Sequence, residues 1–213
     1  MAQGRRRARS GGRTAQAAAS DADWIIDTTM ALIATGGWRS VSLAAVAEET
    51  GLTILQVYRV FASRATILCG FFRRIDEAAL GAPVETETGE RPRDRVFDLL
   101  MRRFDALQPY RAPLTALRRD LPFDPLSALA AGAALLCSMR LTLEAAGIST
   151  DGIGGVIAVK LVAAAYLFAS QTWARDESPD LAPTMASLDR RLRGIERFLV
   201  PRRRAADSSE AAA

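Results

Sequence analysis

Residues 41–61 read VSLAAVAEETGLTILQVYRVF and contain two short helical patterns on either side of a single glycine. Before the first pattern, Ser42 can cap a helix by accepting a hydrogen bond from a backbone N–H. Before the second, Thr53 can do the same, and Gln56 stands at the third helical position, which is the arrangement of a capping box. Gly51 separates the two patterns. The stretch therefore predicts two short helices joined by a tight turn within about 20 residues.

The sequence on either side of this stretch predicts two more helices. Upstream, residues 21–35 place apolar side chains on one side of a helix that ends at Gly36 and Gly37. Downstream, Ser63 can cap a longer helix that ends near Gly81. A support helix followed by a helix, a glycine turn and another helix is the plan of a helix-turn-helix DNA-binding domain. The alternative is an ordinary helical corner in an all-α bundle.

The last helix of this motif has an inward and an outward side. Val57, Val60 and Phe61 share the inward side, so that Leu55 and Arg59 point away from the core. Outward side chains could meet base edges, phosphates or a thymine methyl group. The predicted DNA-contacting residues are Arg59 and Gln56 at base edges, Thr53 and Tyr58 at phosphates, Arg39 and Arg64 beside helix starts, Leu55 on a methyl group, and the cap Ser42.

The rest of the chain continues as helices separated by Gly and Pro, and no segment alternates apolar and polar residues over the length of a strand. Residues 81–93 are polar, have no helical period and contain Gly and Pro, and we interpret them as a linker. Further helices are predicted at about 93–108, after Pro113, and at about 125–146, 152–175 and 183–199. The sequence thus predicts an all-α protein.

The middle helices contain a set of apolar and aromatic residues with few polar groups nearby. Such residues by default pack the core, but the walls of a cavity between these helices would favour a hydrophobic or aromatic guest. The candidate ligand-binding residues are Phe97, Met101, Phe104, Leu117, Met139, Tyr166 and Trp173. The last two helices are apolar over broad faces, which require a partner inside the chain or on another chain.

Charge is unevenly distributed along the chain, whose formal net charge is +4. Residues 1–13 contain five arginines and no acidic residue, and residues 202–204 are three more arginines. Residues 21–70, in contrast, contain five acidic residues and three arginines. Because phosphate neutralisation supplies much of the affinity for DNA, binding by this segment would depend on the arginines before it and would fall steeply with salt. We predict that residues 1–20 are a disordered basic arm and that residues 201–213 are a disordered tail, the alternative role of both being solubility alone.

The composition excludes several classes of function. With no histidine in 213 residues, the chain lacks the commonest general base and metal ligand, and no motif brings together a base, a nucleophile and an oxyanion donor. Cys69 and Cys137 lie in apolar helical patterns without CxxC spacing, which indicates buried cysteines in a reducing compartment. The strongest apolar stretches are shorter than the roughly 20 residues of a membrane span. We therefore predict a cytoplasmic protein that is not an enzyme, has no transmembrane segment and uses no cofactor or metal ion.

Three segments resemble the N-terminal domain of TetR-family transcriptional regulators. They are residues 24–38, from Trp24-Ile25-Ile26-Asp27 to Gly36-Gly37-Trp38, residues 41–53 and residues 57–68. Carried over by position, the resemblance implies that Thr53 caps the recognition helix, that Gln56, Tyr58 and Arg59 touch DNA, and that Arg64 holds a phosphate.

The same resemblance implies a domain layout and a mechanism. It places a three-helix DNA-binding head at residues 21–80 and a larger helical body at residues 93–200, which binds a small effector and forms a homodimer through its last two long helices. Members of the family are regulators, typically repressors. Effector binding between the body helices would change how the two heads match DNA half-sites about one helical turn apart.

Two features depart from that family pattern. Ile54 and Leu55 stand where members typically have a polar or basic residue followed by glycine, and the head is acidic without its arm. In addition, residues 167–180 and 184–192 resemble the C-terminal part of a TetR-fold lipid-binding protein of ubiquinone biosynthesis. That second resemblance implies an alternative function, a lipid-binding accessory protein without sequence-specific DNA binding.

Overall fold

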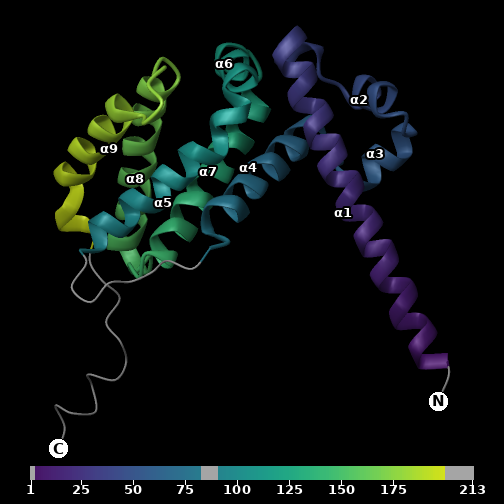
Figure 1. Ribbon diagram of the computed structural model, residues 1–213, viewed down its shortest axis with the longest axis horizontal. Coiled ribbons are helices and arrows are strands. Elements are labelled where there is room, and N and C mark those ends of the chain that lie inside the picture. Colours follow the sequence, from purple (N-terminus) through teal and green to yellow (C-terminus); the bar gives the residue numbers. More distant parts are fainter. Residues whose placement is uncertain (1–2, 83–90, 200–213) are drawn as a thin grey trace, which may run out of the picture. The chain divides into compact units, whose positions relative to one another are not determined.

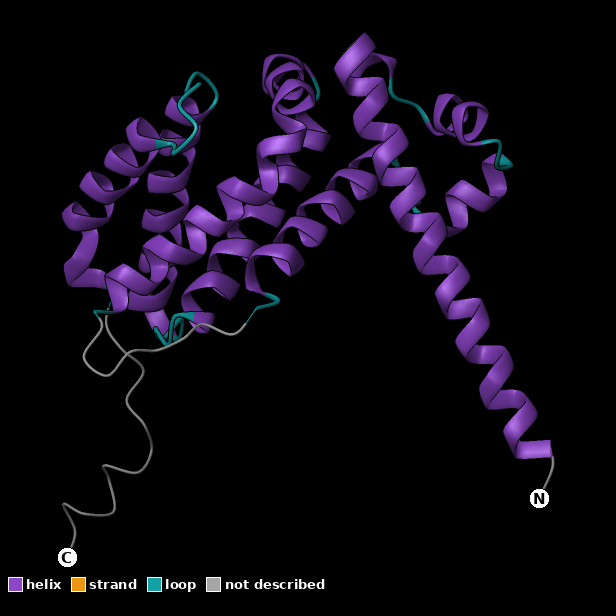
Figure 2. Ribbon diagram, viewed as in Figure 1, coloured by secondary structure: helices purple, strands orange, loops and turns teal. Residues whose placement is uncertain are grey.

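The computed structural model describes residues 3–82 and 91–199, and no β-strand element occurs among them (Figures 1 and 2). The predicted all-α fold class is therefore confirmed. The helices are α1 (Gln3–Gly36), α2 (Leu43–Thr50), α3 (Ile54–Val60), α4 (Arg64–Leu80), α5 (Pro92–Leu107), α6 (Arg111–Asp120), α7 (Pro125–Ala145), α8 (Gly152–Trp173) and α9 (Ala182–Ile195). Short 3-10 turns follow four of these helices at Trp38–Ser40, Gln108–Tyr110, Leu121–Phe123 and Glu196–Phe198.

The chain forms two compact units, which are described separately. The first comprises the residues up to Phe71 together with Tyr110–Gly132, and the second comprises Phe72–Pro109 and the residues from Ala133 onward. Helices α4 and α7 each contribute to both units. The first unit therefore contains α6 and the first turns of α7 in addition to the helix-turn-helix motif. The division into a head at 21–80 and a body at 93–200 stays a prediction.

In the first unit, α1 is the central helix. It contacts α2, α3 and α6, and Figure 1 shows α2 and α3 along one side of it. The apolar side chains in the core of this unit, which also come from α4, are fully buried, and this burial is the main source of stability for so small a unit. They include Ile25, Ile33, Trp38, Val46, Val57, Ile67, Leu68 and Phe71.

In the second unit, α8 lies along α9, and α9 also contacts α5. Apolar residues at helical spacing on α5, α7, α8 and α9 supply the core. The buried members are Val96, Leu99, Leu100, Phe104, Met139, Leu143, Val162, Leu188 and Leu192.

Several sequence expectations need correction or fall outside the described residues. The segment 1–20, expected to be disordered, instead belongs to α1 from Gln3 onward. Its run of Ala, Arg and Gln has high helix propensity, which lets α1 extend toward the N-terminus. Most of the expected linker lies outside the described residues, as does the expected tail at 201–213. The other predicted helices agree with the structure within a few residues.

Two of the described helices, α7 and α8, are apolar over a greater length than the short apolar stretches noted in the sequence. They contain 21 and 22 residues with mean hydropathies of 1.6 and 1.9, which is enough by length and composition to cross a membrane. A core helix of a soluble protein meets the same criteria. About a third of the α7 window and less than half of the α8 window is buried in the chain, and Arg140 and Lys160 interrupt the two helices. These helices do not by themselves indicate a membrane protein.

Candidate nucleic-acid interface

Local hydrogen bonds fix the two helices of the motif. The Ser42 hydroxyl accepts a hydrogen bond from the Ala45 backbone N–H at 3.1 Å and caps α2. Gly51 ends α2 with a φ of 72°, a left-handed conformation that costs glycine little. The indole Nε1 of Trp24 on α1 donates to the Thr50 carbonyl at 3.3 Å, which ties the end of α2 to the support helix. The end of α2 is thus fixed both by the conformation of Gly51 and by the contact with α1.

The predicted capping box at the start of α3 is present. The Thr53 hydroxyl accepts from the Gln56 backbone N–H at 3.3 Å, and the Gln56 Oε1 accepts from the Thr53 backbone N–H at 2.8 Å. The Thr53 hydroxyl also donates to the same Oε1 at 2.8 Å. Since the side-chain oxygen of Gln56 is used in the cap, its amide N–H groups are what it can offer to DNA. Gln56 in this conformation can donate to a base or phosphate, but it cannot make the donor-and-acceptor pair that recognises adenine.

Helix α3 buries one side and exposes the other. Val57 is fully buried and Phe61 is 7% exposed, whereas Leu55 is 54% exposed and Tyr58 is 56% exposed. Arg59 is exposed as well, and it forms no ion pair or hydrogen bond with any described residue. An exposed guanidinium beside an exposed methyl-bearing side chain is a combination that can contact a guanine edge and a thymine methyl group.

The other residues expected at phosphates lie at the edges of this surface. Ser42 and Thr53 are exposed at the starts of α2 and α3, where N–H groups favour an anion. The exposed Arg39 lies just before α2, with its guanidinium carbon 5.0 Å from the centroid of the Phe123 ring. Seven of the predicted residues thus occur on α3 or near the helix starts around it. The set is Arg39, Ser42, Thr53, Leu55, Gln56, Tyr58 and Arg59.

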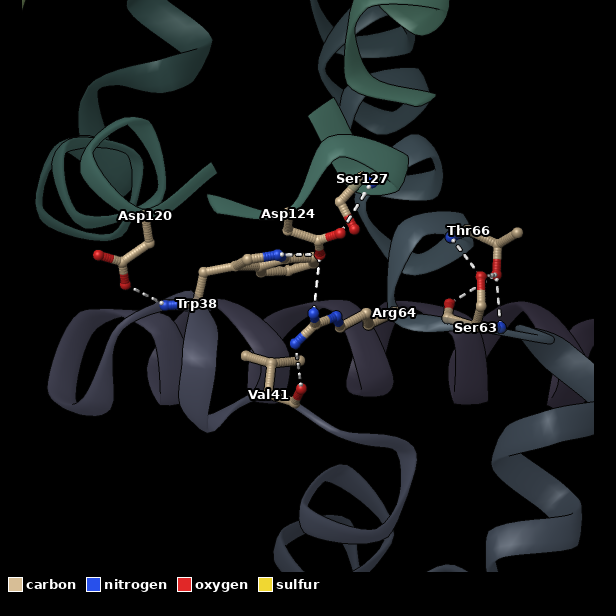
Figure 3. Close-up of polar contacts among 8 residues, drawn as sticks. All are labelled: Trp38, Val41, Ser63, Arg64, Thr66, Asp120, Asp124 and Ser127. Atoms are coloured by element: carbon tan, nitrogen blue, oxygen red, sulfur yellow. Dashed lines mark hydrogen bonds and ion pairs between the residues drawn. The ribbon is translucent and has the colours of Figure 1, made fainter. Parts of the chain in front are cut away.

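Arg64 has a different environment, in which its guanidinium is already engaged (Figure 3). Its Nη2 donates to the Asp124 Oδ2 at 2.8 Å and its Nη1 donates to the Val41 carbonyl at 3.3 Å. The guanidinium carbon also lies 5.2 Å from the centroid of the Trp38 ring. Arg64 therefore braces the residue that precedes the α2 cap against the start of α7.

Sequence reasoning did not anticipate this polar cluster, in which two aspartates hold Trp38 (Figure 3). The Trp38 indole Nε1 donates to the Asp124 Oδ2 at 3.0 Å, and the Trp38 backbone N–H donates to the Asp120 Oδ2 at 2.9 Å. Hydrogen bonds from Ser127 and Trp38, together with the charge of Arg64, lower the pKa of Asp124 to about 2. The hydrogen bond from Arg119, with that from Trp38, lowers the pKa of Asp120. Both carboxylates are therefore charged at neutral pH.

The approach of Asp120 explains one of the two glycines that end α1. Gly37 has a φ of 74°, and a Cβ atom built on it would lie 2.5 Å from the Asp120 Oδ2. Any side chain at this position would be strained and would push the carboxylate away from the Trp38 N–H. The glycine pair was visible in the sequence, but its partner lies more than 80 residues further along the chain.

The residues expected to bind a ligand are only partly brought together. In the second unit, Phe104 stacks on Tyr166 with ring centroids 5.0 Å apart and on Trp173 with centroids 6.0 Å apart. Met139 is buried in the same unit, and Phe97 and Met101 are half-buried there. Leu117 is buried in the first unit instead.

A buried polar network adjoins this aromatic stack, and it too was missed. Arg103, which is 2% exposed, forms an ion pair with Asp76 and donates from its Nε to the Tyr166 hydroxyl at 3.3 Å. The Ser138 hydroxyl donates to the other carboxylate oxygen of Asp76 at 2.5 Å. Burial raises the pKa of Tyr166, so its hydroxyl stays protonated. The sequence carries no local signal for this charged pair, because both α4 and α5 carry many other charged residues.

The described residues contain no cluster of acidic or sulfur side chains that could hold a metal ion. Cys69 is half-buried and Cys137 is exposed, so the expectation that both are buried is wrong for Cys137. The helical pattern identified the apolar environment of α7 correctly, but it did not show which side of that helix remains uncovered.

Comparisons with known proteins agree with the geometry of the first unit. Residues 25–68 match the family of bacterial regulatory proteins known as the tetR family. No curated protein matches the chain by sequence. The fold resembles that of a TetR transcriptional regulator from Nitrosomonas europaea ATCC 19718, with a TM-score of 0.62 and 22% identity over 82% of this chain and 97% of that one.

Two further solved structures share this fold. A TetR regulator from Rhodococcus sp. RHA1 gives a TM-score of 0.60 and 20% identity, covering 81% of this chain and 93% of that one. A TetR regulator from Streptomyces coelicolor gives a TM-score of 0.56 and 19% identity, covering 84% of this chain and 99% of that one. The match at 25–68 lies on the helix-turn-helix described above, and the shared fold extends over most of the rest. Residues 25–68 are therefore similar to the tetR family of bacterial regulatory proteins, and the chain shares the fold of these solved TetR regulators.

Proposed function

We propose that the protein is a ligand-responsive transcriptional regulator that binds operator DNA as a homodimer in the cytoplasm, with no catalytic activity. The observation that carries this proposal is the exposed side of α3. Leu55, Gln56, Tyr58 and Arg59 are all exposed on a short helix whose start is fixed by a capping box. A rigid helix that presents polar and apolar contacts away from the core fits the major groove of DNA.

The electrostatics of binding come from two sources in this proposal. Arg59 and Arg39 meet the duplex at the motif itself, while acidic residues elsewhere in the head oppose binding. The arginines among residues 1–13 belong to the segment that continues α1 toward the N-terminus, and they supply the missing positive charge. Affinity should therefore fall steeply as the salt concentration rises.

The apolar face of α8 supports the dimer. Its exposed residues recur at helical spacing and include Ile153, Val156, Ile157, Ala164, Leu167 and Phe168. Among them Ile153 is 82% exposed and Val156 is 52% exposed. Such a stripe is unfavourable in water and is typical of an interface between helices. We propose that a second copy covers it together with the exposed residues of α9.

The effector in this proposal binds among the body helices near the stack of Phe104, Tyr166 and Trp173. A guest among these aromatic side chains would be hydrophobic or aromatic. The neighbouring guanidinium of Arg103 lies beside the Tyr166 hydroxyl, so a guest with a hydrogen-bond acceptor would find a donor at this place.

A second candidate function is a lipid-binding accessory protein, and the exposure of Ile54 and Leu55 favours it. These side chains are 55% and 54% exposed on the side of α3 that would face DNA. They make that side more apolar than a surface that contacts phosphates and polar base edges. In this alternative the helix meets a membrane surface or a protein, and the aromatic stack of the second unit binds a lipid.

One set of measurements distinguishes the two functions. Full-length protein should retard DNA that flanks its own gene in a gel-shift assay at low salt. The substitution Arg59→Ala should weaken this binding at least about fivefold, because a bidentate contact to a base contributes about 1–3 kcal/mol. Arg73→Ala, which removes an exposed arginine from α4, is the matched control and should bind as the unmodified protein does.

The opposite pattern would favour the lipid-binding function. If full-length protein leaves every flanking fragment unshifted but floats with phospholipid vesicles, the regulator proposal is wrong. Lipid that remains bound to the purified protein after Arg59→Ala would support the same conclusion.

A further inference from the structure

A pocket of about 570 Å³ lies in the first unit, between the last turn of α1 and the helix α6. Figure 1 shows these two elements side by side, and they are in direct contact. Residues 33–37 form one wall, and α6 forms the other with Ala112, Ala116, Arg118 and Arg119. None of the residues predicted to bind DNA or effector lines it. Its volume falls in the range of pockets that hold small molecules.

The α6 wall carries positive charge that the protein does not neutralise. Arg118 is exposed and forms no ion pair or hydrogen bond with any described residue. Arg119 donates from its Nε to the Asp120 Oδ1 at 3.2 Å, but its side chain is 76% exposed. The pocket therefore has one guanidinium without a partner and a second with unused N–H groups. Two guanidinium groups on adjacent residues can together bind a carboxylate or a phosphate.

The α1 wall supplies hydrogen-bond acceptors. The last carbonyl groups of a helix have no partner within it unless the chain supplies one. In a continued helix the Trp38 N–H would donate to the Ala34 carbonyl, but here it donates to Asp120. The Gly37 N–H is the other nearby donor that could reach the Ala34 carbonyl, but it donates to the Ile33 carbonyl instead. The carbonyl of Ala34 therefore remains an acceptor at the side of the pocket.

We propose that this pocket binds a small organic anion that also carries hydrogen-bond donors, such as a hydroxylated carboxylate or a sugar phosphate. Arg118 and Arg119 bind the anionic group. The carbonyl groups at the end of α1 accept hydrogen bonds from hydroxyl groups. Ala34, Ala112 and Ala116 leave room for the carbon chain between them. The occupant differs in chemistry from the aromatic guest proposed for the second unit.

An occupant of this pocket would contact α6 next to the Asp120 carboxylate that holds the Trp38 N–H. It would thereby stabilise one position of α6 against the turn that leads into α2. This regulatory consequence rests on the proposed DNA binding, whereas the binding of the anion does not. A change in operator affinity on addition of the anion is therefore a second, separate measurement.

The test is isothermal titration calorimetry of the full-length protein with four probes. D-gluconate and glucose 6-phosphate carry both an anionic group and hydroxyl donors. Hexanoate carries only the anionic group, and sorbitol carries only the hydroxyl groups. We expect the first two to bind, hexanoate to bind at least about tenfold more weakly, and sorbitol to give no heat, since a lost charge-assisted hydrogen bond corresponds to about a tenfold change or more.

Two variants assign the binding to this pocket. Arg118→Gln, at an exposed position, should weaken the binding of gluconate and glucose 6-phosphate about tenfold. Ala112→Phe should abolish it by filling the pocket while leaving both arginines in place, and circular dichroism should show an unchanged helix content. Arg73→Ala is the control for net charge and should bind as the unmodified protein does.

Three results would overturn the proposal. The first is the absence of heat with both hydroxylated anions, and the second is unchanged binding by Arg118→Gln. The third is weaker operator binding by Arg118→Gln with no anion present, which would assign Arg118 to a DNA phosphate. If the unmodified protein binds the anions but no DNA, the pocket proposal stands and the proposed regulator function fails.

Discussion

At the scale of single residues, Asp124 links parts of the first unit that are far apart in sequence. Its carboxylate accepts from Trp38, Arg64 and Ser127, so that one side chain holds the turn before α2, the start of α4 and the start of α7 (Figure 3). Its side chain is 16% exposed, so water weakens these interactions only partly. The position of the α2 cap therefore depends on a residue outside the DNA-binding motif.

Replacement of Asp124 tests this role. Asp124→Asn keeps the shape of the side chain but removes its charge, and it should lower the free energy of unfolding by about 1–3 kcal/mol at neutral pH. The measurement is urea denaturation followed by circular dichroism. Asp105→Asn, at an exposed carboxylate with no partner among the described residues, should change it little. Equal losses in the two variants would show that the cluster contributes nothing specific.

The lowered pKa of Asp124 also predicts how this contribution depends on pH. A carboxyl group whose folded pKa lies below its unfolded value stabilises the fold above the unfolded pKa and loses that effect as the pH falls through the folded pKa. For Asp124 the unfolded pKa is 3.8 and the folded pKa is about 2. The difference in stability between the unmodified protein and Asp124→Asn should therefore shrink as the pH falls from 4 toward 2. A difference that stays constant over this window would contradict the assignment.

The buried network in the second unit gives a further prediction for single residues. Arg103→Leu would leave the Asp76 carboxylate buried without its cation, which typically costs about 3–5 kcal/mol. The double variant Arg103→Leu with Asp76→Leu should recover much of this loss, because no unpaired charge remains. Chemical denaturation of both variants measures the two effects. A double variant as unstable as the single one would show that packing, and not charge, determines the cost.

At the scale of elements, the sequence predicted what neighbouring residues determine. Ser42, Thr53 and Gln56 act within three positions of the groups they cap, so their hydrogen bonds could be inferred from spacing. The side of α3 that is exposed followed from helical periodicity for the same reason. Spacing could not show contacts between distant residues: Arg64 is predicted at a phosphate, and its contact with Asp124, 60 positions away, had no signal in the sequence. Periodicity also could not show that α6 belongs with the head.

The recognition helix is short, so its cap should affect both folding and binding. Thr53→Ala removes the hydroxyl that accepts the Gln56 N–H, and loss of such a cap typically costs about 1 kcal/mol. We expect a lower midpoint in urea and weaker operator binding. Ser149→Ala, which changes a hydroxyl in the second unit whose hydrogen bonds with Asp151 are long, at 3.4 and 3.5 Å, is the comparison. If Thr53→Ala weakens DNA binding without changing stability, Thr53 contacts DNA itself instead of acting through the helix.

At the scale of the whole molecule, the proposed homodimer depends on the exposed apolar stripe on α8. Two recognition helices that read successive half-sites must be held at a fixed distance, and a single copy cannot do this. Val156→Arg places a charge on the stripe at a position that is 52% exposed, so the fold of one chain should tolerate it. In the proposed dimer this charge would be buried without a partner, which strongly disfavours association.

Sedimentation equilibrium should then give a dimer for the unmodified protein and a monomer for Val156→Arg, with unchanged circular dichroism. Leu141→Arg is the matched control, because Leu141 is 47% exposed on α7, outside the α8 stripe. The monomeric variant should also lose most of its affinity for a two-half-site operator while retaining weak binding to one half-site, since each head keeps its own contacts. If a monomeric variant binds the full operator as tightly as the unmodified protein does, the α8 stripe is not needed for DNA recognition. The stripe would then be a surface for a lipid or another protein.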